Sequence, residues 1–301
     1  MLAGFAAPLL RRRIPAPPLL AQTVAFAAPV GLCVAVRRSR RRDIAVCCLQ
    51  MWAYVAAYKT PHDDSSNQAQ RVHVRYPIVA DRLLGLGRLP SVRLQRGLAR
   101  SGPDGPRWTA LDRVLVWAHW SWFAVPHSAI LYIMVRHPRR FVRAATLTYA
   151  VFDVGAAFYW VLPTAPPWYA AGRGEEGQEA LEVRRMMVEY GEDFWGDGWG
   201  SLYSVFGGNP LAAMPSLHFA TSLMAASLLA ETGSGAGMVG YGYLITLGFA
   251  LVYLGEHYLV DLLGGVALTA GVKRLAPHAT EPLRRAAGIV SRLEEMAHGE
   301  A

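Results

Sequence analysis

Lysine is almost absent from this 301-residue sequence, and charged residues of any kind are scarce. Lysine occurs only at Lys59 and Lys273, so the other 28 of the 30 basic residues are arginines, and Asp, Glu, Lys and Arg together make up 17% of the chain. Soluble domains average about 25% charged and about 45–50% apolar residues, whereas 53% of this chain is apolar. The composition therefore excludes a single soluble enzyme and a disordered chain.

Cysteine is also scarce, and its placement excludes a disulfide-stapled secreted module. Cys33, Cys47 and Cys48 all lie in apolar segments, and none forms a CxxC pair. We predict that they are small buried hydrophobic residues and neither disulfide partners nor metal ligands. The net charge of +8 favours anionic lipid over nucleic acid as a partner, because the Arg clusters adjoin apolar segments and no nucleic-acid motif is present.

The apolar residues come in long blocks with Arg-rich segments between them, which is the layout of a polytopic membrane protein. A spanning helix needs about 20 apolar residues, and the third, fourth and fifth blocks reach that length. A tight turn joins the sixth block to the seventh. The first block is either an uncleaved anchor, which the lack of a clean cleavage site favours, or the core of a signal peptide. The seven blocks are Leu19–Val36, Ile44–Tyr58, Val114–Val135, Phe141–Leu162, Leu211–Ala230, Met238–Leu254 and Tyr258–Ala276.

Short basic loops predict how the chain crosses the membrane. The clusters Arg37–Arg42, Arg136–Arg143 and Lys273-Arg274 can all be cytoplasmic if the spans alternate. The loops 59–113 and 163–210 and the turn at His257 then fall together on the other side. We therefore predict a multi-pass protein of the cell membrane with its site on the non-cytoplasmic side.

The same reading divides the chain into four parts. The segment Arg71–Arg100 is a broken amphipathic run that is expected on the membrane surface. Within 163–210, a helix is predicted over Glu175–Tyr190, in a stretch rich in acidic residues. This stretch is either a solvated acidic face or a lid over a site, and both readings stay open. The four parts are N-terminal apolar segments (1–60), an amphipathic non-cytoplasmic segment (61–113), a catalytic membrane bundle with a lid loop at 163–210 (114–276) and a cytoplasmic tail (277–301).

Two of the nine histidines lie where apolar helices meet the non-cytoplasmic surface. Ser216, which follows Pro215, is a plausible N-cap, and this places His218 in the first turn of a helix, where free N–H groups attract an anion such as phosphate. His257 and Asp261 are four residues apart, so on a helix they share a face. The carboxylate can hold one ring nitrogen of His257 and leave the other free as a nucleophile.

These groups predict phosphoryl transfer through a phosphohistidine. His257 would attack phosphorus, Asp261 would stabilise its positive charge, and His218 would protonate the leaving oxygen and then activate the acceptor. The structural alternative is that each histidine only bonds a neighbouring helix. For His119 and His127 we favour this alternative, as partners of Asp153 within the membrane.

Both segments resemble signatures of a known family. Pro215-Ser216-Leu217-His218 and His257-Tyr258-x-x-Asp261 look like P-S-x-H and H-x3-D, the second and third signatures of the type 2 phosphatidic acid phosphatase superfamily. Within it, Pro163–Trp168 and the E-H-Y-x-x-D form at Glu256 resemble the inositol phosphorylceramide synthase branch, and Tyr76–Gln95 is similar to that branch less specifically.

The resemblance implies an all-α fold with a six-helix membrane bundle, and metal-independent phosphotransfer without a cofactor. The apolar segments before residue 60 add an extra N-terminal apolar helix to this bundle. The sequence departs from the family's phosphatases, which carry a K-x6-R-P signature and an Arg six residues before the nucleophilic His; Leu251 stands at that last position. The synthase branch likewise lacks these cations, which favours it. Arg75, Arg82, Arg88 and Arg173 are candidates to neutralise the phosphate, and otherwise face water or lipid headgroups. The expected site consists of catalytic His218, His257 and Asp261 and substrate-binding Ser216, Tyr258, Arg82, Arg88 and Arg173, with no metal ligand.

The leading hypothesis is a lipid phosphotransferase that passes a phosphate-bearing headgroup from a phospholipid donor to a lipid hydroxyl. With water as acceptor, the same residues would make a lipid or isoprenoid phosphate phosphatase. A serine hydrolase using Ser216 and His257 is less favoured, because no G-x-S-x-G elbow surrounds the serine. A zinc site would need His218, His257 and Asp261 together, and a transporter or scaffold would need none of them.

Overall fold

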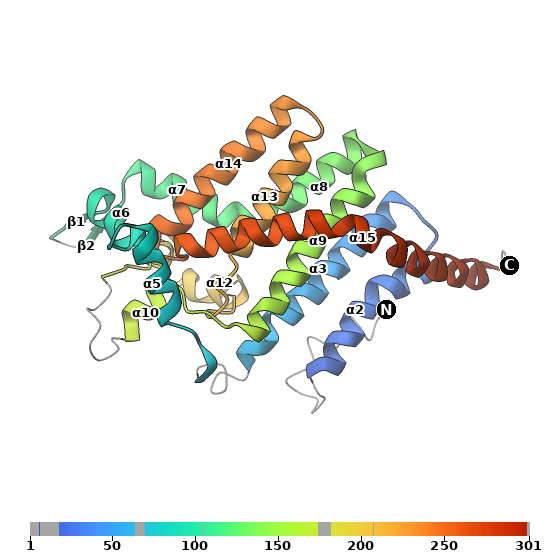
Figure 1. The fold of residues 1–301 in the computed structure, drawn as a ribbon, viewed down its shortest axis with the longest axis horizontal. Coiled ribbons are helices and arrows are strands. Elements are labelled where there is room, and N and C mark those ends of the chain that lie inside the picture. Colours follow the sequence, from blue (N-terminus) through green and yellow to red (C-terminus); the bar gives the residue numbers. More distant parts are fainter. Residues whose placement is uncertain are drawn as a thin grey trace. The chain divides into compact units, whose positions relative to one another are not determined.

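The computed structural model of the protein describes residue 6 and residues 18–63, 70–103, 105–173, 182–206 and 208–299. Most of these residues are helical, which confirms the predicted all-α class (Figure 1). The two short strands among them, β1 (Arg100–Gly102) and β2 (Gly105–Arg107), pair with each other in antiparallel fashion. The chain forms two compact units, one made of residues 1–63 and 271–301 and the other of residues 64–270.

The first unit is built on a hairpin of apolar helices, α2 (Pro18–Ala35) and α3 (Arg40–Asp63), which lie side by side (Figure 1). Arg42, at the start of α3, donates to the carbonyls of Cys33 and Val36 at 3.0 and 2.7 Å and pairs with Glu294 at 2.6 Å. One nitrogen of this mostly buried guanidinium, Nη1, thus bonds both the end of α2 and the C-terminal segment. Cys33, Cys47 and Cys48 form no disulfide among the described residues, but the prediction that they are buried is wrong: Cys33 and Cys47 are half-buried and Cys48 is exposed.

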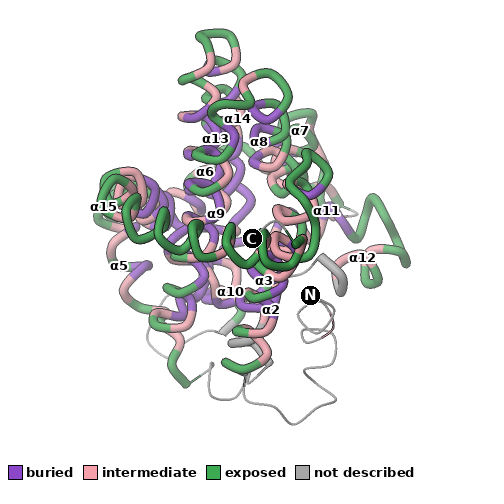
Figure 2. The backbone as a smooth tube through the Cα atoms, turned by 90° about the vertical axis from the view of Figure 1, so that its right-hand side faces the viewer, coloured by how far each residue is buried: buried purple, intermediate pink, exposed green. Residues whose placement is uncertain are grey.

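The second unit carries every residue of the predicted site. Two long apolar helices and a shorter one pack side by side within it: α9, α14 and α13 (Figure 1). Their contact faces are buried, whereas the outward faces are exposed (Figure 2). The helices with residues in this unit are α5 (Arg75–Leu84), α6 (Pro90–Leu98), α7 (Ala110–Trp120), α8 (Ala124–Arg136), α9 (Pro138–Val161), α10 (Pro167–Arg173), α11 (Met186–Trp195), α12 (Gly198–Phe206), α13 (Leu217–Ala230), α14 (Ser234–Tyr253) and the first part of α15 (Leu259–His298).

Two of the described helices, α9 and α14, are long and apolar enough to cross a membrane. On α14, the large side chains of Met238, Val239 and Ile245 are each more than 70% exposed. Apolar side chains this exposed, on a helix that satisfies its own backbone hydrogen bonds, suit contact with lipid chains better than contact with water.

The predicted span Val114–Val135 is interrupted. The chain forms α7, then a 3-10 turn at Ser121–Phe123, and then α8. Pro126 has no N–H with which to continue the helical ladder, and the Ser121 hydroxyl donates to the carbonyl of Ala118 at 3.1 Å, which competes with that ladder. The interruption places Trp122 and the end of α7 beside the N-terminus of α13.

The fifth apolar block also differs from the prediction, because its helix begins only at Leu217. Residues 211–213 instead run alongside residues 163–165, with bridges from Thr164 to Ala212 and to His73. The backbone bonds are 2.9 to 3.2 Å long, such as Thr164 N–H to the Leu211 carbonyl. The block is therefore part extended segment, which supports the site, and part helix.

Two further helix predictions change. The helix expected at Glu175–Tyr190 begins at Met186, because residues 182–185 are not helical, and residues 174–181 lie outside the described part of the chain. The face of α11 with Met186, Met187 and Tyr190 packs on α7 and α14, whereas Glu192 and Asp193 are exposed. At the other end of the chain, α15 continues without a break through Pro277 into the tail.

Candidate active site

The site is built around two histidines from separate parts of the chain. Nδ1 of His218, in the first turn of α13, lies 3.2 Å from Nε2 of His257, in the turn between α14 and α15. Nδ1 of His257 in turn lies 3.3 Å from Oδ2 of Asp261. If the Nδ1–H of His257 donates a hydrogen bond to the carboxylate, its Nε2 is the acceptor nitrogen and accepts a hydrogen bond from the Nδ1–H of His218. Nε2 of His257 then carries the lone pair that could act as a nucleophile, and His218 holds a proton next to it.

His257 and Asp261 meet in a different way from the one predicted. His257 precedes α15 and is not part of it, whereas Asp261 lies in its first turn. Oδ2 of Asp261 also accepts the backbone N–H of Tyr258 at 2.9 Å, which satisfies a free donor at the start of the helix. One carboxylate oxygen thus fixes both the helix start and the imidazole, and both side chains are almost fully buried.

A second carboxylate also supports the start of α15. Asp81 of α5 is fully buried, and its Oδ1 accepts the backbone N–H of Val260 at 2.9 Å. Burial raises the pKa of the Asp81 carboxyl to about 6, against the lowering effect of the bonds from the α15 backbone. Asp81 thereby anchors the amphipathic segment to the helix that carries Asp261.

The segment that carries His218 is held close to α15. The backbone N–H of Ser216 donates to the Asp261 carbonyl at 3.0 Å, and the Tyr159 hydroxyl donates to the Pro215 carbonyl at 2.8 Å. A Cβ at Gly265 would lie 2.8 Å from the Ser216 carbonyl oxygen, so the approach of the two segments requires glycine there. These contacts hold the start of α13, which carries His218, against the start of α15, which carries Asp261.

Ser216 and Tyr258, both predicted to bind substrate, lie inside the protein. The Ser216 hydroxyl is the N-cap of α13 and accepts the N–H of Phe219 at 3.3 Å. Tyr258 is fully buried in an apolar cluster with Ile78, Leu89 and Ala170. Both positions support packing and capping more directly than contact with a substrate.

Replacing Ser216 with alanine should lower the free energy of unfolding by about 1 kcal/mol, the usual value of an N-cap, and leave most of the turnover. Thermal unfolding of the purified protein and its turnover check this together. A folded variant with no turnover at all would favour a serine nucleophile instead.

A third histidine lies beside the first two. The ring of His119, near the end of α7, stacks on that of His218 with centroids 5.0 Å apart, and the Trp122 ring lies 4.1 Å from His218 on a centroid basis. Both ring nitrogens of His119 are buried and have no hydrogen-bond partner among the described residues. The sequence interpretation of His119 as a partner of Asp153 within the membrane is therefore wrong, because the break after α7 places His119 beside His218.

The arginines predicted to hold phosphate make no direct contact with the histidines among the described residues. Arg88 is exposed, and Arg82 is a half-exposed electrostatic neighbour of Tyr258. Within the described part of the chain, no hydrogen bond or ion pair joins Arg75, Arg82 or Arg88 to His218, His257 or Asp261. Arg173 ends α10, and its side chain lies outside the described residues.

One basic residue at the site, Arg185, was not predicted from the sequence. The Arg185 guanidinium lies over the Trp168 ring, with Cζ 3.6 Å from the centroid, and its Nε lies 3.1 Å from Oε1 of Glu256, the residue before His257. Arg184 and Arg185 are the only basic residues in the acidic stretch from Glu175 to Asp197. That contrast was the available signal.

Both histidine segments lie in the part of the chain that matches a known family. The model of the PAP2 superfamily matches residues 107–275, more than half of the chain, including both histidine segments. The chain belongs to the PAP2 superfamily. It is therefore a membrane protein of a lipid phosphotransferase and phosphatase family, as the two signatures implied.

Within the PAP2 superfamily, the chain is similar to two curated fungal proteins. It is 32% identical over 124 residues to the inositol phosphorylceramide synthase catalytic subunit of Schizosaccharomyces pombe, which covers 38% of this chain and 27% of the relative. It is 26% identical over 157 residues to the inositol phosphorylceramide synthase of Candida albicans, covering 50% of this chain and 32% of the relative. The matched part thus spans about a third or less of these relatives. No solved structure matches the chain.

Proposed function

We propose that this protein is a membrane lipid phosphotransferase that moves a phosphate-bearing headgroup, of the inositol-phosphate class, from a phospholipid to the hydroxyl of a second lipid. The observation that carries the proposal is the contact of 3.2 Å between His218 and His257, with Asp261 on the other nitrogen of His257. Both relatives described above are named as inositol phosphorylceramide synthases, which favours transfer over hydrolysis.

The first half-reaction forms a covalent intermediate. Nε2 of His257 attacks the phosphorus, the bond from phosphorus to the glyceryl oxygen breaks, and His218 gives its proton to that oxygen, which leaves as diacylglycerol. Asp261 stabilises the positive imidazole that results. The headgroup phosphate is then bonded to His257.

The second half-reaction regenerates the enzyme. The acceptor hydroxyl attacks the same phosphorus, His218 takes its proton, and the bond from phosphorus to Nε2 of His257 breaks. No metal ion or cofactor takes part in the scheme. Water in place of the lipid hydroxyl would turn the reaction into hydrolysis.

The proposal includes a topology. The chain would cross the membrane as the family's six-helix bundle, with α2 as an additional N-terminal helix, and the site would face the non-cytoplasmic side. Support comes from α13, which has His218 in its first turn and Glu231 just after its end, where Glu231 pairs with Arg143 at 2.5 Å. The basic cluster at Arg136–Arg143 and the site are thus at opposite ends of one helix, as the positive-inside rule requires.

Transfer is tested directly with purified protein in vesicles that hold phosphatidylinositol with a labelled phosphate and an unlabelled ceramide. We expect label on the ceramide, together with released diacylglycerol. If label appears only as free inositol phosphate, the protein is a hydrolase. If the label stays on the donor whichever lipid acceptor is added, a transporter or scaffold is favoured. The variants described in the Discussion assign any activity to the site.

A further inference from the structure

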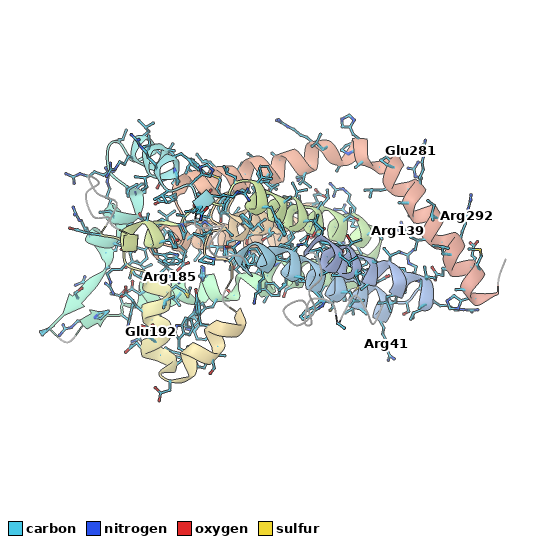
Figure 3. All side chains as sticks on the ribbon, turned by 90° about the horizontal axis from the view of Figure 1, so that it is seen from below. Arg41, Arg139, Arg185, Glu192, Glu281 and Arg292 are labelled. Atoms are coloured by element: carbon cyan, nitrogen blue, oxygen red, sulfur yellow. The ribbon has the colours of Figure 1, made fainter. Side chains whose placement is uncertain are left out.

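The side chain of Arg185 is held in a fixed position at the edge of the histidine site. It precedes α11, and its side chain is 23% exposed, while its partner Glu256 is 10% exposed. The guanidinium is held on three sides: by the carboxylate of Glu256, by the face of Trp168 and by the hydroxyl of Tyr203. Figure 3 labels Arg185 on the segment that leads into α11.

The backbone on either side of Arg185 is clamped. Gln95 of α6 accepts the N–H of Arg184 at 2.9 Å and donates to the carbonyls of Arg184 and Tyr253 at 2.9 and 2.8 Å. The N–H of Met186 donates to the Leu254 carbonyl at 3.2 Å. A Cβ at Gly255 would lie 2.6 Å from the Arg184 carbonyl oxygen, and its φ of +80° also favours glycine.

This clamp separates the two neighbouring arginines. Arg184 forms an ion pair with Glu189 and lies near the Trp108 ring, whereas Arg185 forms its ion pair with Glu256. Glu256 directly precedes His257 in the turn between α14 and α15. The clamp therefore brings Arg185, and not Arg184, to the turn that carries His257. Arg184 is therefore a matched control for Arg185.

The two histidines need a positively charged group nearby to neutralise the bound phosphate. A phosphodiester carries a negative charge into a partly buried site, and a buried charge is costly unless it is paired. Leu251 stands where the phosphatases of the superfamily carry arginine, and it is fully buried. His119, whose ring nitrogens lack partners among the described residues, stacks on His218 and is an electrostatic neighbour of Arg185, Glu256 and His257.

We propose that Arg185 is the phosphate-binding cation of this site and that His119 completes the phosphate subsite. The inference rests on the proposed function and names the group that holds the transferred phosphate. Glu256 engages Nε and Nη2, at 3.1 and 3.5 Å, so it uses one edge of the guanidinium. Three N–H groups of the guanidinium remain; the Tyr203 hydroxyl accepts one of them, which leaves two N–H donors for phosphate oxygens. Glu256, Trp168 and Tyr203 are positioning residues that hold the fork in place.

The test compares Arg185→Met and Arg185→Lys with Arg184→Met in two measurements. The first is turnover with the labelled phosphatidylinositol donor. We expect kcat/KM to fall by about a hundredfold or more in Arg185→Met and partly in Arg185→Lys, which keeps the charge but not the fork. Arg184→Met should stay near the wild-type value.

The second measurement needs no turnover: the rise in unfolding temperature that inorganic phosphate produces in the purified protein. We expect this rise in the wild type, in Arg184→Met and in His257→Ala, but not in Arg185→Met. His119→Gln should reduce it. A wild-type protein that gains nothing from phosphate, or an Arg185→Met variant that gains as much as the wild type, would overturn the subsite.

The two measurements separate this inference from the proposed function. A phosphate effect that depends on Arg185, in a protein that transfers no headgroup, would keep the subsite and reject lipid phosphotransfer. Transfer that depends on His257 but not on Arg185 would keep the function and reject the subsite.

Discussion

Replacing His257 with alanine should reduce headgroup transfer by about a thousandfold or more, the scale of losing a covalent nucleophile. The reason is that Nε2 of His257 is the one atom of the site that is both held by a buried carboxylate, through its ring, and adjacent to a proton donor. No other described side chain shares this arrangement. Removing the ring leaves the phosphate with no group to attack it.

The same variant tests the intermediate. Wild-type protein mixed with a donor labelled in its phosphate, without acceptor, and quenched in alkali should carry label on His257, because acid would cleave the phosphorus–nitrogen bond. His257→Ala should carry none. Asp261→Asn should label more slowly, because the amide cannot stabilise the positive imidazole.

The matched control is His127→Ala. His127 lies on α8, where Nδ1 of its ring is 2.7 Å from the Phe123 carbonyl oxygen, and it has no part in the scheme. Turnover should therefore stay close to the wild-type value in this variant. Equal loss in His127→Ala and His257→Ala would mean that either change merely disturbs the fold, and label on the protein in His257→Ala would place the nucleophile elsewhere.

The sequence predicted the central contacts of the site because their signals are local. Pro215-Ser216 marks a helix start, and the capping bond from Phe219 to Ser216 is made. The spacing of His257 and Asp261 brings the two side chains within 3.3 Å, although His257 lies in the turn before α15. An acidic residue at the third position of a helix reaches back to the N-cap, so the pair forms without a shared helical face.

The residues that the sequence did not place depend on contacts between distant segments. Arg185 reaches the site only because Gln95 and Gly255 clamp the preceding residue. The acidic stretch makes Arg184 and Arg185 conspicuous in the sequence but does not show which segments they contact. His119 reaches His218 because the chain breaks at Ser121–Phe123. A composition window reads residues 114–135 as one apolar block and does not resolve a turn inside it.

Replacing His218 with alanine should lower transfer from the natural donor by about a hundredfold to ten-thousandfold, the range of general acid–base catalysis. The glyceryl oxygen is a poor leaving group that needs a proton as its bond to phosphorus breaks. A donor with a nitrophenolate leaving group does not need that proton, because the nitrophenolate anion is stable. We therefore expect a much smaller loss in the first half-reaction with the nitrophenyl donor.

The geometry supports this proposed role of His218. Phosphorus must come between His218 and His257, whose facing nitrogens are 3.2 Å apart in the empty site, so one ring has to turn away. His257 is held by Asp261 and is 4% exposed, whereas His218 is only half-buried. We expect His218 to turn and to place its proton on the far side of phosphorus, next to the leaving oxygen, as an in-line displacement requires.

The two donors also keep the test independent of folding. A misfolded His218→Ala variant would lose both donors equally, and so would His257→Ala, whereas a missing acid loses the natural donor selectively. With the nitrophenyl donor, His218→Ala should also accumulate label on His257, because no base remains to activate the acceptor hydroxyl. Equal losses with the two donors in a variant that unfolds at the wild-type temperature would show that His218 supplies no proton, and the roles of the two histidines would have to be reassigned.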